Sequence, residues 1–121
     1  MGLVNGGLAL ISDRVGAVAA GAAVGWLAYG TGTTAFSASQ TALVTETARA
    51  AGTVTRVTTN VSNDTLQLVK AFSISSTLTI TEVGAFNASS GGTMLCRTKL
   101  ATPRDVTSGS TFTYTQKVVF S

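Results

Sequence analysis

The chain has 121 residues, of which 45% are hydrophobic, so it is long enough for one domain with a buried core and too short for two ordinary domains. Only 11% of the residues are charged, against roughly a quarter in a typical soluble domain. The eight Lys and Arg give a net charge of +3 but stand singly, without interleaved aromatic residues, so we expect no nucleic-acid partner. The absence of histidine removes the commonest general base and the commonest metal ligand.

The N-terminal third is apolar and carries no charge from Val15 to Thr45. Its most hydrophobic part, residues 17–28, is shorter than the roughly 20 residues of a membrane-spanning helix and is rich in Ala and Gly. A signal peptide needs a basic segment followed at once by an apolar run, whereas the first basic residue here is Arg14. We therefore expect a soluble chain with no membrane partner and no export signal.

One or two short helices are expected near the start of the chain. Residues 3–14 and the next position place Leu8, Ile11 and Val15 at i, i+3 and i+7, which predicts an amphipathic helix beginning after two glycines. A Ser-Ala-Ser-Gln sequence with the spacing of a capping box opens residues 37–46, which allows one further helical turn.

The rest of the chain alternates between apolar and polar residues with a period of two, which is typical of strands. A Ser-Ser-Gly-Gly sequence at 89–92 predicts a tight turn, and the strand after it is expected to close just before Pro103. Many short strands joined by turns predict a single mostly β domain over residues 1–121, an antiparallel β-sandwich or a jelly-roll-like barrel with one or two short N-terminal helices. The expected strands are 24–29, 53–61, 65–75, 77–87, 93–100 and 111–120.

The sequence YGTGTTAF at 29–36 resembles a phosphate-binding loop in composition but not in detail. A Walker loop requires a lysine after its glycines, and the first lysine of this chain is Lys70. A dinucleotide fingerprint requires a third glycine where Ala35 stands. We therefore interpret Gly30 and Gly32 as positions with unusual backbone angles and expect no cofactor.

No catalytic or metal-binding constellation is evident in the sequence. The chain has five Asp and Glu, and the one in the middle of an apolar strand face is Glu82. A buried carboxylate requires a partner, so we expect a structural ion pair between Glu82 and Arg49, Arg56 or Arg97. Cys96 cannot form an internal disulfide and is expected to be buried or half-buried in its strand.

Four motifs occur in a fixed order along nearly the whole chain. They are Gly-Thr-Gly-Thr-Thr at 30–34, Thr-Ala-Leu-Val-Thr-Glu at 41–46, Thr-Glu-Val-Gly-Ala-Phe-Asn at 81–87 and Ser-Gly-Gly-Thr at 90–93. Together they resemble a family of small structural proteins of tailed bacteriophages, whose members are labelled as tail-fibre or head-decoration proteins. The resemblance implies a non-enzymatic component of the virion that is assembled in the bacterial host cytoplasm.

Three functions follow from this resemblance and from the composition. The leading hypothesis is a capsid decoration (cement) protein that binds the major capsid protein and stabilises the head as a small homo-oligomer. The first alternative is a tail-fibre, baseplate or collar adaptor that binds other tail proteins. A more distant alternative is a carbohydrate-binding module in which Trp26, Tyr29 or Tyr114 stacks on a glycan.

The expected interface is drawn from the start of the chain and from the glycine-threonine loop. Residues 1–23, rich in small side chains, are interpreted as a docking arm or as a helix that covers the sandwich. Basic side chains at the rim are expected to pair with carboxylates of the partner. The predicted interface residues are Leu3, Leu8, Ile11, Arg14, Thr31, Thr33, Phe36 and Arg104.

Overall fold

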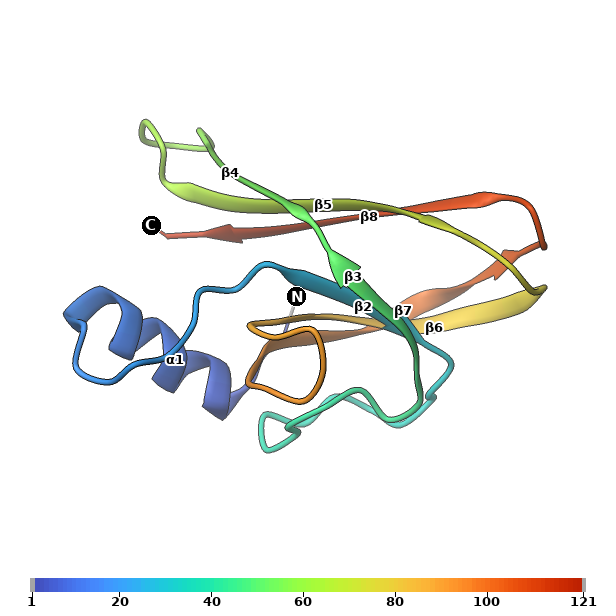
Figure 1. Cartoon of the computed structure of the whole chain (residues 1–121), viewed down its shortest axis with the longest axis horizontal. Coiled ribbons are helices and arrows are strands. Elements are labelled where there is room, and N and C mark those ends of the chain that lie inside the picture. Colours follow the sequence, from blue (N-terminus) through green and yellow to red (C-terminus); the bar gives the residue numbers. More distant parts are fainter. Residues whose placement is uncertain (1, 121) are drawn as a thin grey trace.

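The computed structural model describes residues 2–120 and folds them into eight strands and one helix (Figure 1). Residues 1 and 121, the two ends of the predicted domain, lie outside the described range. The helix is α1 (Asn5–Gly16), and the strands are β1 (Gly2–Leu3), β2 (Trp26–Gly30), β3 (Glu46–Ala51), β4 (Thr53–Val57), β5 (Thr65–Ser73), β6 (Leu78–Phe86), β7 (Met94–Val106) and β8 (Thr111–Val119).

The strands form two antiparallel sheets that pack face to face. The larger sheet has the strand order β1-β7-β6-β2-β3, and the smaller has the order β4-β5-β8. In Figure 1 the smaller sheet is the upper layer, and α1 lies at one end of the lower layer. This confirms the predicted mostly β antiparallel sandwich with a short N-terminal helix. No strand pairing joins the two sheets within residues 2–120. The architecture is therefore a sandwich, and the jelly-roll-like barrel, the other predicted form, is not observed.

The core lies between the sheets; β8 contributes alternate residues to it, whereas β6 buries every residue from Ile80 to Phe86. Aromatic side chains from both layers meet at its centre: the ring of Tyr29 packs edge-on against Phe72 at 4.9 Å and against Phe112 at 5.8 Å between centroids. Cys96 is fully buried in the same core, as expected, and burial raises the pKa of its thiol to about 11.

Helix α1 forms where a helix was predicted, but it begins at Asn5 instead of after Gly7, and its buried face differs from the predicted one. Leu8 and Val15 are 52% and 85% exposed, and the buried positions are Gly7 and Leu10. A Cβ atom on Gly7 would lie 2.1 Å from the backbone oxygen of Leu95, so the missing side chain lets the helix backbone lie directly against β7. The apolar period pointed to the wrong face because the contact residue has no side chain.

The further helical turn that the sequence allowed at 37–46 does not form, so the described residues hold one helix, within the one or two expected. Residues 37–40 form a turn in which the Gln40 N–H donates to the Ser37 carbonyl, and the Ser37 N–H donates to Oε1 of Gln40, both at 3.1 Å. The side-chain half of the predicted capping box therefore exists without a helix. Further along the loop, the backbone N–H groups of Val44 and Thr45 bond to the carboxylate of Glu82 instead of to helical carbonyls.

Two strands depart from the sequence pattern. β3 was not predicted, because its alanine-rich sequence ETARAA lacks the β-branched residues that mark strands. β7 continues through Pro103 to Val106, although it was expected to close before this proline. This part of β7 is an edge that pairs with β6 only, and the pairing passes from Lys99 to Arg104 across a register shift. Pro103 therefore lies in an irregular stretch where its missing N–H removes no paired position.

Candidate functional site

A buried ion pair lies at the middle of the larger sheet. Glu82 on β6 and Arg97 on β7 are both 0% exposed, and Nε of Arg97 donates to Oε1 of Glu82 at 2.9 Å. This confirms the predicted structural ion pair and selects Arg97 from the three arginines considered. Neighbouring strands place the two side chains together, because Val83 and Gly84 of β6 are paired with Thr98 and Arg97 of β7.

The same carboxylate organises the loop from 31 to 45. Glu82 accepts hydrogen bonds from the backbone N–H groups of Gly32 at 2.8 Å, Val44 at 2.8 Å and Thr45 at 2.7 Å. With Arg97 this gives four donors on one carboxylate, which satisfies a buried charge. The two ends of the loop are thereby fixed to one side chain of β6.

The guanidinium of Arg97 binds the other parts of the loop. Its Nη2 donates to the carbonyl of Thr34 at 2.9 Å, and its Nη1 donates to Oε1 of Gln40 at 3.3 Å. Every buried side-chain nitrogen and oxygen that the structure describes has a hydrogen-bond partner. The Glu82–Arg97 pair is therefore the structural anchor of the 31–45 loop, which contains most of the motifs at 30–34 and 41–46.

Hydrogen bonding lowers the pKa of the Glu82 carboxyl. Burial by itself raises this pKa, but the bonds donated by Thr45, Val44, Arg97 and Gly32 outweigh the effect of burial. The pKa of Glu82 consequently lies below its ordinary value of 4.5, and the carboxylate is ionised at neutral pH.

The glycines of the 31–45 region serve close packing and do not bind phosphate in this arrangement. A Cβ on Gly30 would lie 2.2 Å from the backbone oxygen of Thr45, and a Cβ on Gly32 would lie 2.4 Å from Oε2 of Glu82. Neither glycine is among the described residues with positive φ, so the expectation of unusual backbone angles was wrong. The N–H of Gly32 already donates to the carboxylate of Glu82, so it is not free to bind a phosphate.

A second ion pair stabilises the neighbouring turn. Arg49 on β3 bonds Glu46 at 2.7 Å, and its guanidinium lies 3.6 Å from the centroid of the Phe86 ring. The same guanidinium donates to the carbonyl of Gly91 in the turn predicted at 89–92 and to that of Ala88 just before it. The Glu46 side chain is 30% exposed, so this pair is partly solvated, unlike the Glu82–Arg97 pair.

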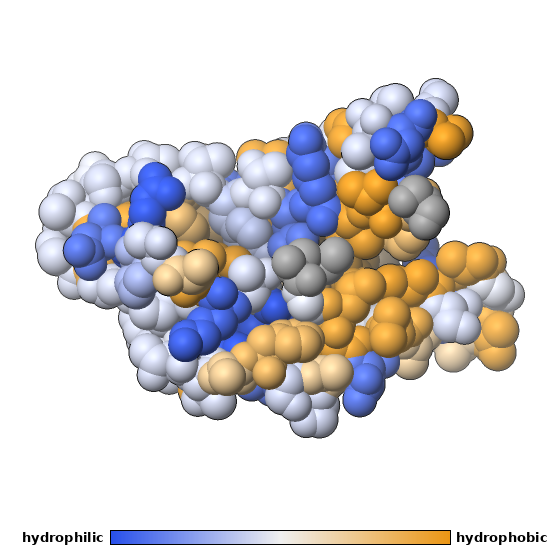
Figure 2. All heavy atoms as spheres, turned by 180° about the vertical axis from the view of Figure 1, so that it is seen from behind, coloured by the Kyte–Doolittle hydropathy of each residue, from blue (hydrophilic) through white to orange (hydrophobic). Residues whose placement is uncertain are grey.

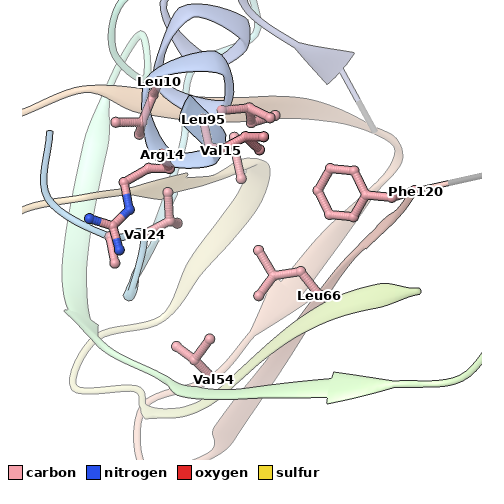
Figure 3. A pocket seen from close by; sticks show the side chains of 10 residues that line it. Leu10, Arg14, Val15, Val24, Val54, Leu66, Leu95 and Phe120 are labelled. Atoms are coloured by element: carbon pink, nitrogen blue, oxygen red, sulfur yellow. The ribbon is translucent and has the colours of Figure 1, made fainter. Parts of the chain in front are cut away.

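An apolar groove opens between α1 and the smaller sheet. Its volume is about 420 Å³, and Figure 3 shows side chains from α1 facing side chains from β4 and β5 across it. We call it the apolar groove, and it is lined by Leu10, Ile11, Arg14, Val15, Ala23, Val24, Val54, Leu66, Leu95 and Phe120.

The apolar groove is the place where exposed hydrophobic side chains gather. Val15, Val54 and Phe120 are among the large hydrophobic residues that the fold leaves exposed, and all three line it. Figure 2 shows this hydrophobic surface from behind, along α1 and across the hollow toward the smaller sheet. Arg14 is the one charged side chain in the lining, and its Nη1 donates to the carbonyl of Gly21 at 3.2 Å.

The predicted interface residues fall in three separate places. Ile11 and Arg14 line the apolar groove, whereas Leu8 is exposed on α1 outside the lining, and Leu3 packs against the core. Arg104 borders a second hollow between β7 and β8.

The loop residues of the predicted interface form the third place. Thr33 and Phe36 are exposed, and Thr31 is half-buried. The ring of Phe36 lies against Gly2, where an added Cβ would come within 2.5 Å of it. The structure therefore separates these residues from the apolar groove, and no single surface unites the predicted set.

Several groove residues were not predicted as part of an interface. Val54, Leu66 and Phe120 lie on elements far apart in the sequence, and Val24 lies just before β2. The only sequence signal was an apolar residue at the end of a strand, which is equally typical of the core.

The aromatic residues considered for glycan stacking form no exposed platform. Tyr29 and Tyr114 are 5% and 7% exposed and belong to the core, and Trp26 is half-buried against a second small cluster. The described residues contain no group of three potential metal ligands. Nor does the part of the chain from 2 to 120 include a helix long and apolar enough to span a bilayer.

Comparison with known protein families assigns the chain to one of them. The family described as Podophage GP4 fiber I protein gp80 matches residues 14–119, which is nearly the whole sequence. The chain belongs to this family. It is therefore a structural protein of a bacteriophage virion, as the four ordered motifs implied. Searches of curated proteins and of solved structures found no match.

Proposed function

We propose that this protein is a component of a podophage tail fibre and that it attaches to a neighbouring virion protein through the apolar groove. The observation that carries the proposal is the family match over residues 14–119, because the family is described as a fibre protein. That match supports a place in the tail better than the capsid decoration role expected from the sequence. The matched range includes most of the groove lining, from Arg14 to Leu95.

The chemistry of the apolar groove defines what it would bind. Covering Val15, Val54 and Phe120 removes apolar surface from water, which contributes on the order of a few kcal/mol to association. One N–H group of Arg14 bonds the carbonyl of Gly21, and its other N–H groups are available to a partner. The other residues that line the groove are uncharged. The fitting partner is a segment of another fibre protein that presents apolar side chains beside a carboxylate.

The rest of the molecule suits a rigid attachment module. The sandwich buries a main core between its sheets and a second, smaller cluster, and the 31–45 loop is fixed by the Glu82–Arg97 pair instead of being free to close on a substrate. A structural role needs shape-matched contact over roughly 1,600 Å² in total and no reactive group. The proposed partner is therefore a tail protein, and the proposed activity is assembly.

Copy number and position on the particle test this proposal. Calibrated mass spectrometry of purified virions would compare this chain with the major capsid protein, and antibody labelling in the electron microscope would locate it. A few copies for each particle, with label at the tail, are expected. A ratio near one for each capsid subunit, with label on the head, would overturn the tail-fibre assignment in favour of capsid decoration.

A pair of lysine substitutions tests the apolar groove itself. Val54→Lys places a second cation in the groove beside Arg14, and we expect virions assembled with this variant to lack the protein. Val61→Lys is the matched control, because Val61 is 67% exposed and lies outside the groove lining. Both variants are expected to fold within about 0.5 kcal/mol of the natural chain, since exposed substitutions are usually mild. Normal incorporation of Val54→Lys would contradict the proposed docking site.

A further inference from the structure

Strand β8 leaves one edge of the smaller sheet unpaired. It spans nine residues, pairs only with β5 among the described strands, and keeps an unbroken register with it from Thr111 to Val119. At its two ends the Ile74 N–H donates to the Ser110 carbonyl at 2.9 Å, and the Phe120 N–H donates to the Asp64 carbonyl at 2.9 Å.

These two hydrogen bonds show which backbone groups of β8 point outward. Residues of an antiparallel strand direct their N–H and C=O alternately to one side and to the other. Ser110 and Phe120 both bond toward β5, so the even-numbered residues between them do the same. The free edge therefore presents the N–H and C=O groups of Thr111, Thr113, Thr115, Lys117 and Val119.

No other edge of the sandwich is as long and as regular. β4 has five residues, β3 pairs with β2 across a register shift, and the free part of β7 contains Pro103. Folded proteins usually protect edges with such short strands, irregular pairing and prolines. β8 has none of these and carries one charge, Lys117. An open hollow of about 430 Å³ runs beside it, so the edge is accessible.

We infer that two copies of the chain pair through this edge, with their β8 strands antiparallel about a twofold axis at Thr115. This register overlaps all nine residues and brings outward-facing groups opposite one another, which permits about ten backbone hydrogen bonds. Thr115 then lies opposite the partner's Thr115, and Thr113 lies opposite the partner's Lys117. The two three-stranded sheets become one continuous sheet.

The side chains of β8 complement themselves in this register, which is why a second copy is the fitting partner. The twofold axis keeps both core faces on the same side, so Phe112 comes opposite the partner's Val118 and Tyr114 opposite the partner's Gln116. Aromatic and β-branched cross-strand pairs are favourable, and the register places no two lysines directly opposite. The Lys117 carbonyl already accepts a bond from the Gln116 amide at 3.1 Å but keeps a second lone pair for the partner.

The oligomeric state of the purified chain tests the inference without reference to its place in the virion. Sedimentation equilibrium over a concentration series should show a monomer–dimer equilibrium. Thr115→Pro removes an outward N–H without removing a bond to β5, so this variant should keep its circular dichroism and sediment as a monomer. Thr115→Val keeps the N–H and should remain a dimer. A natural chain that stays monomeric up to about 1 mM, or a folded Thr115→Pro variant that still dimerises, would overturn the inference.

A charge placed at one position tests the register even if the proline variant does not fold. Thr113→Glu puts a carboxylate opposite the partner's Lys117 and should lower the dimer dissociation constant by up to about fivefold at low salt. Thr111→Glu is the matched control, since its carboxylate would lie opposite the partner's Val119 and gain no such partner. Equal dissociation constants for the two glutamate variants would refute pairing about Thr115.

Discussion

The larger sheet buries a charged pair, Glu82 and Arg97, whereas the smaller sheet buries apolar side chains and a neutral polar pair, Tyr114 and Gln116. The difference follows from what each sheet supports. The larger sheet carries the 31–45 loop, whose backbone groups need partners away from water. The buried pair bonds four of these groups, three N–H groups at Glu82 and the carbonyl of Thr34 at Arg97. The smaller sheet carries no comparable loop, so alternation of apolar and polar residues is sufficient to define it.

The largest expected effect comes from neutralising the carboxylate in the larger sheet. Glu82→Gln leaves Arg97 buried without its counter-charge. It also places the NH2 group of the new amide against backbone N–H groups, which are donors too. We expect the free energy of unfolding to fall by about 3–5 kcal/mol in urea denaturation. Glu46→Gln, in the partly solvated pair, is the matched control and should cost at most about 1 kcal/mol. Equal losses would show that burial does not separate the two pairs.

Acid should produce the same loss gradually in the natural chain. The folded state holds the pKa of Glu82 below 4.5, so the stability that this carboxylate contributes is complete above pH 4.5. It is lost as the pH falls below 4.5 and through the lower pKa of the folded state. Unfolding free energies measured from pH 7 downward should therefore decline more steeply for the natural chain than for Glu82→Gln.

Asp64 must be separated from Glu82 in that experiment. Hydrogen bonds from the backbone of Val61 and Thr59 lower the pKa of Asp64 as well, so it also contributes to acid sensitivity. Both chains retain Asp64, so the difference between their pH profiles isolates Glu82. Parallel profiles would contradict the assigned role of the buried carboxylate.

A smaller effect is expected where α1 meets the larger sheet. Gly7→Ala forces a methyl group against the Leu95 carbonyl, and we expect a loss of about 1–3 kcal/mol in thermal or urea unfolding. Gly6→Ala is the control on the same turn, because its Cβ would meet only a Thr93 methyl at 3.6 Å. It should be neutral or stabilising by up to about 1 kcal/mol through helix propensity. The reverse order would mean that α1 does not rest on β7 through Gly7.

The smallest effect should come from the polar pair of the other sheet. Tyr114→Phe removes the hydroxyl that donates to Oε1 of Gln116 at 2.5 Å but keeps the ring in the core. We expect a loss of about 0.5–1.5 kcal/mol, measured by urea denaturation. A loss as large as that of Glu82→Gln would remove the contrast between the two sheets.

Much of the smaller sheet could be predicted from the sequence alone. Leu66, Leu68 and Phe72 of β5 alternate as the period of two requires, and Phe112, Tyr114 and Val118 of β8 do the same. Strand pairing here agrees with local propensity, so pattern and structure coincide.

In the larger sheet, the existence of an ion pair at Glu82 was also predicted, because a glutamate within an apolar strand face needs a cation.

The larger sheet was less predictable, because its features depend on contacts between distant segments. The alanine-rich β3 is a strand because β2 supplies its hydrogen bonds, although its composition does not favour one. The apolar groove is likewise a product of assembly, since α1, β4, β5 and residue Phe120 contribute to it from across the chain. Nothing local in those segments distinguishes a groove residue from a core residue.

The sequence by itself determined the class of fold, the positions of most strands and turns, and the family to which the chain belongs. These rest on local alternation and on short motifs, which need no knowledge of the partner strand. Only the tertiary structure decided which arginine pairs with Glu82, which face of α1 is buried, and where the apolar groove lies. Each of these depends on which segments meet in space, and in the case of Gly7 the decisive contact is made by a residue without a side chain.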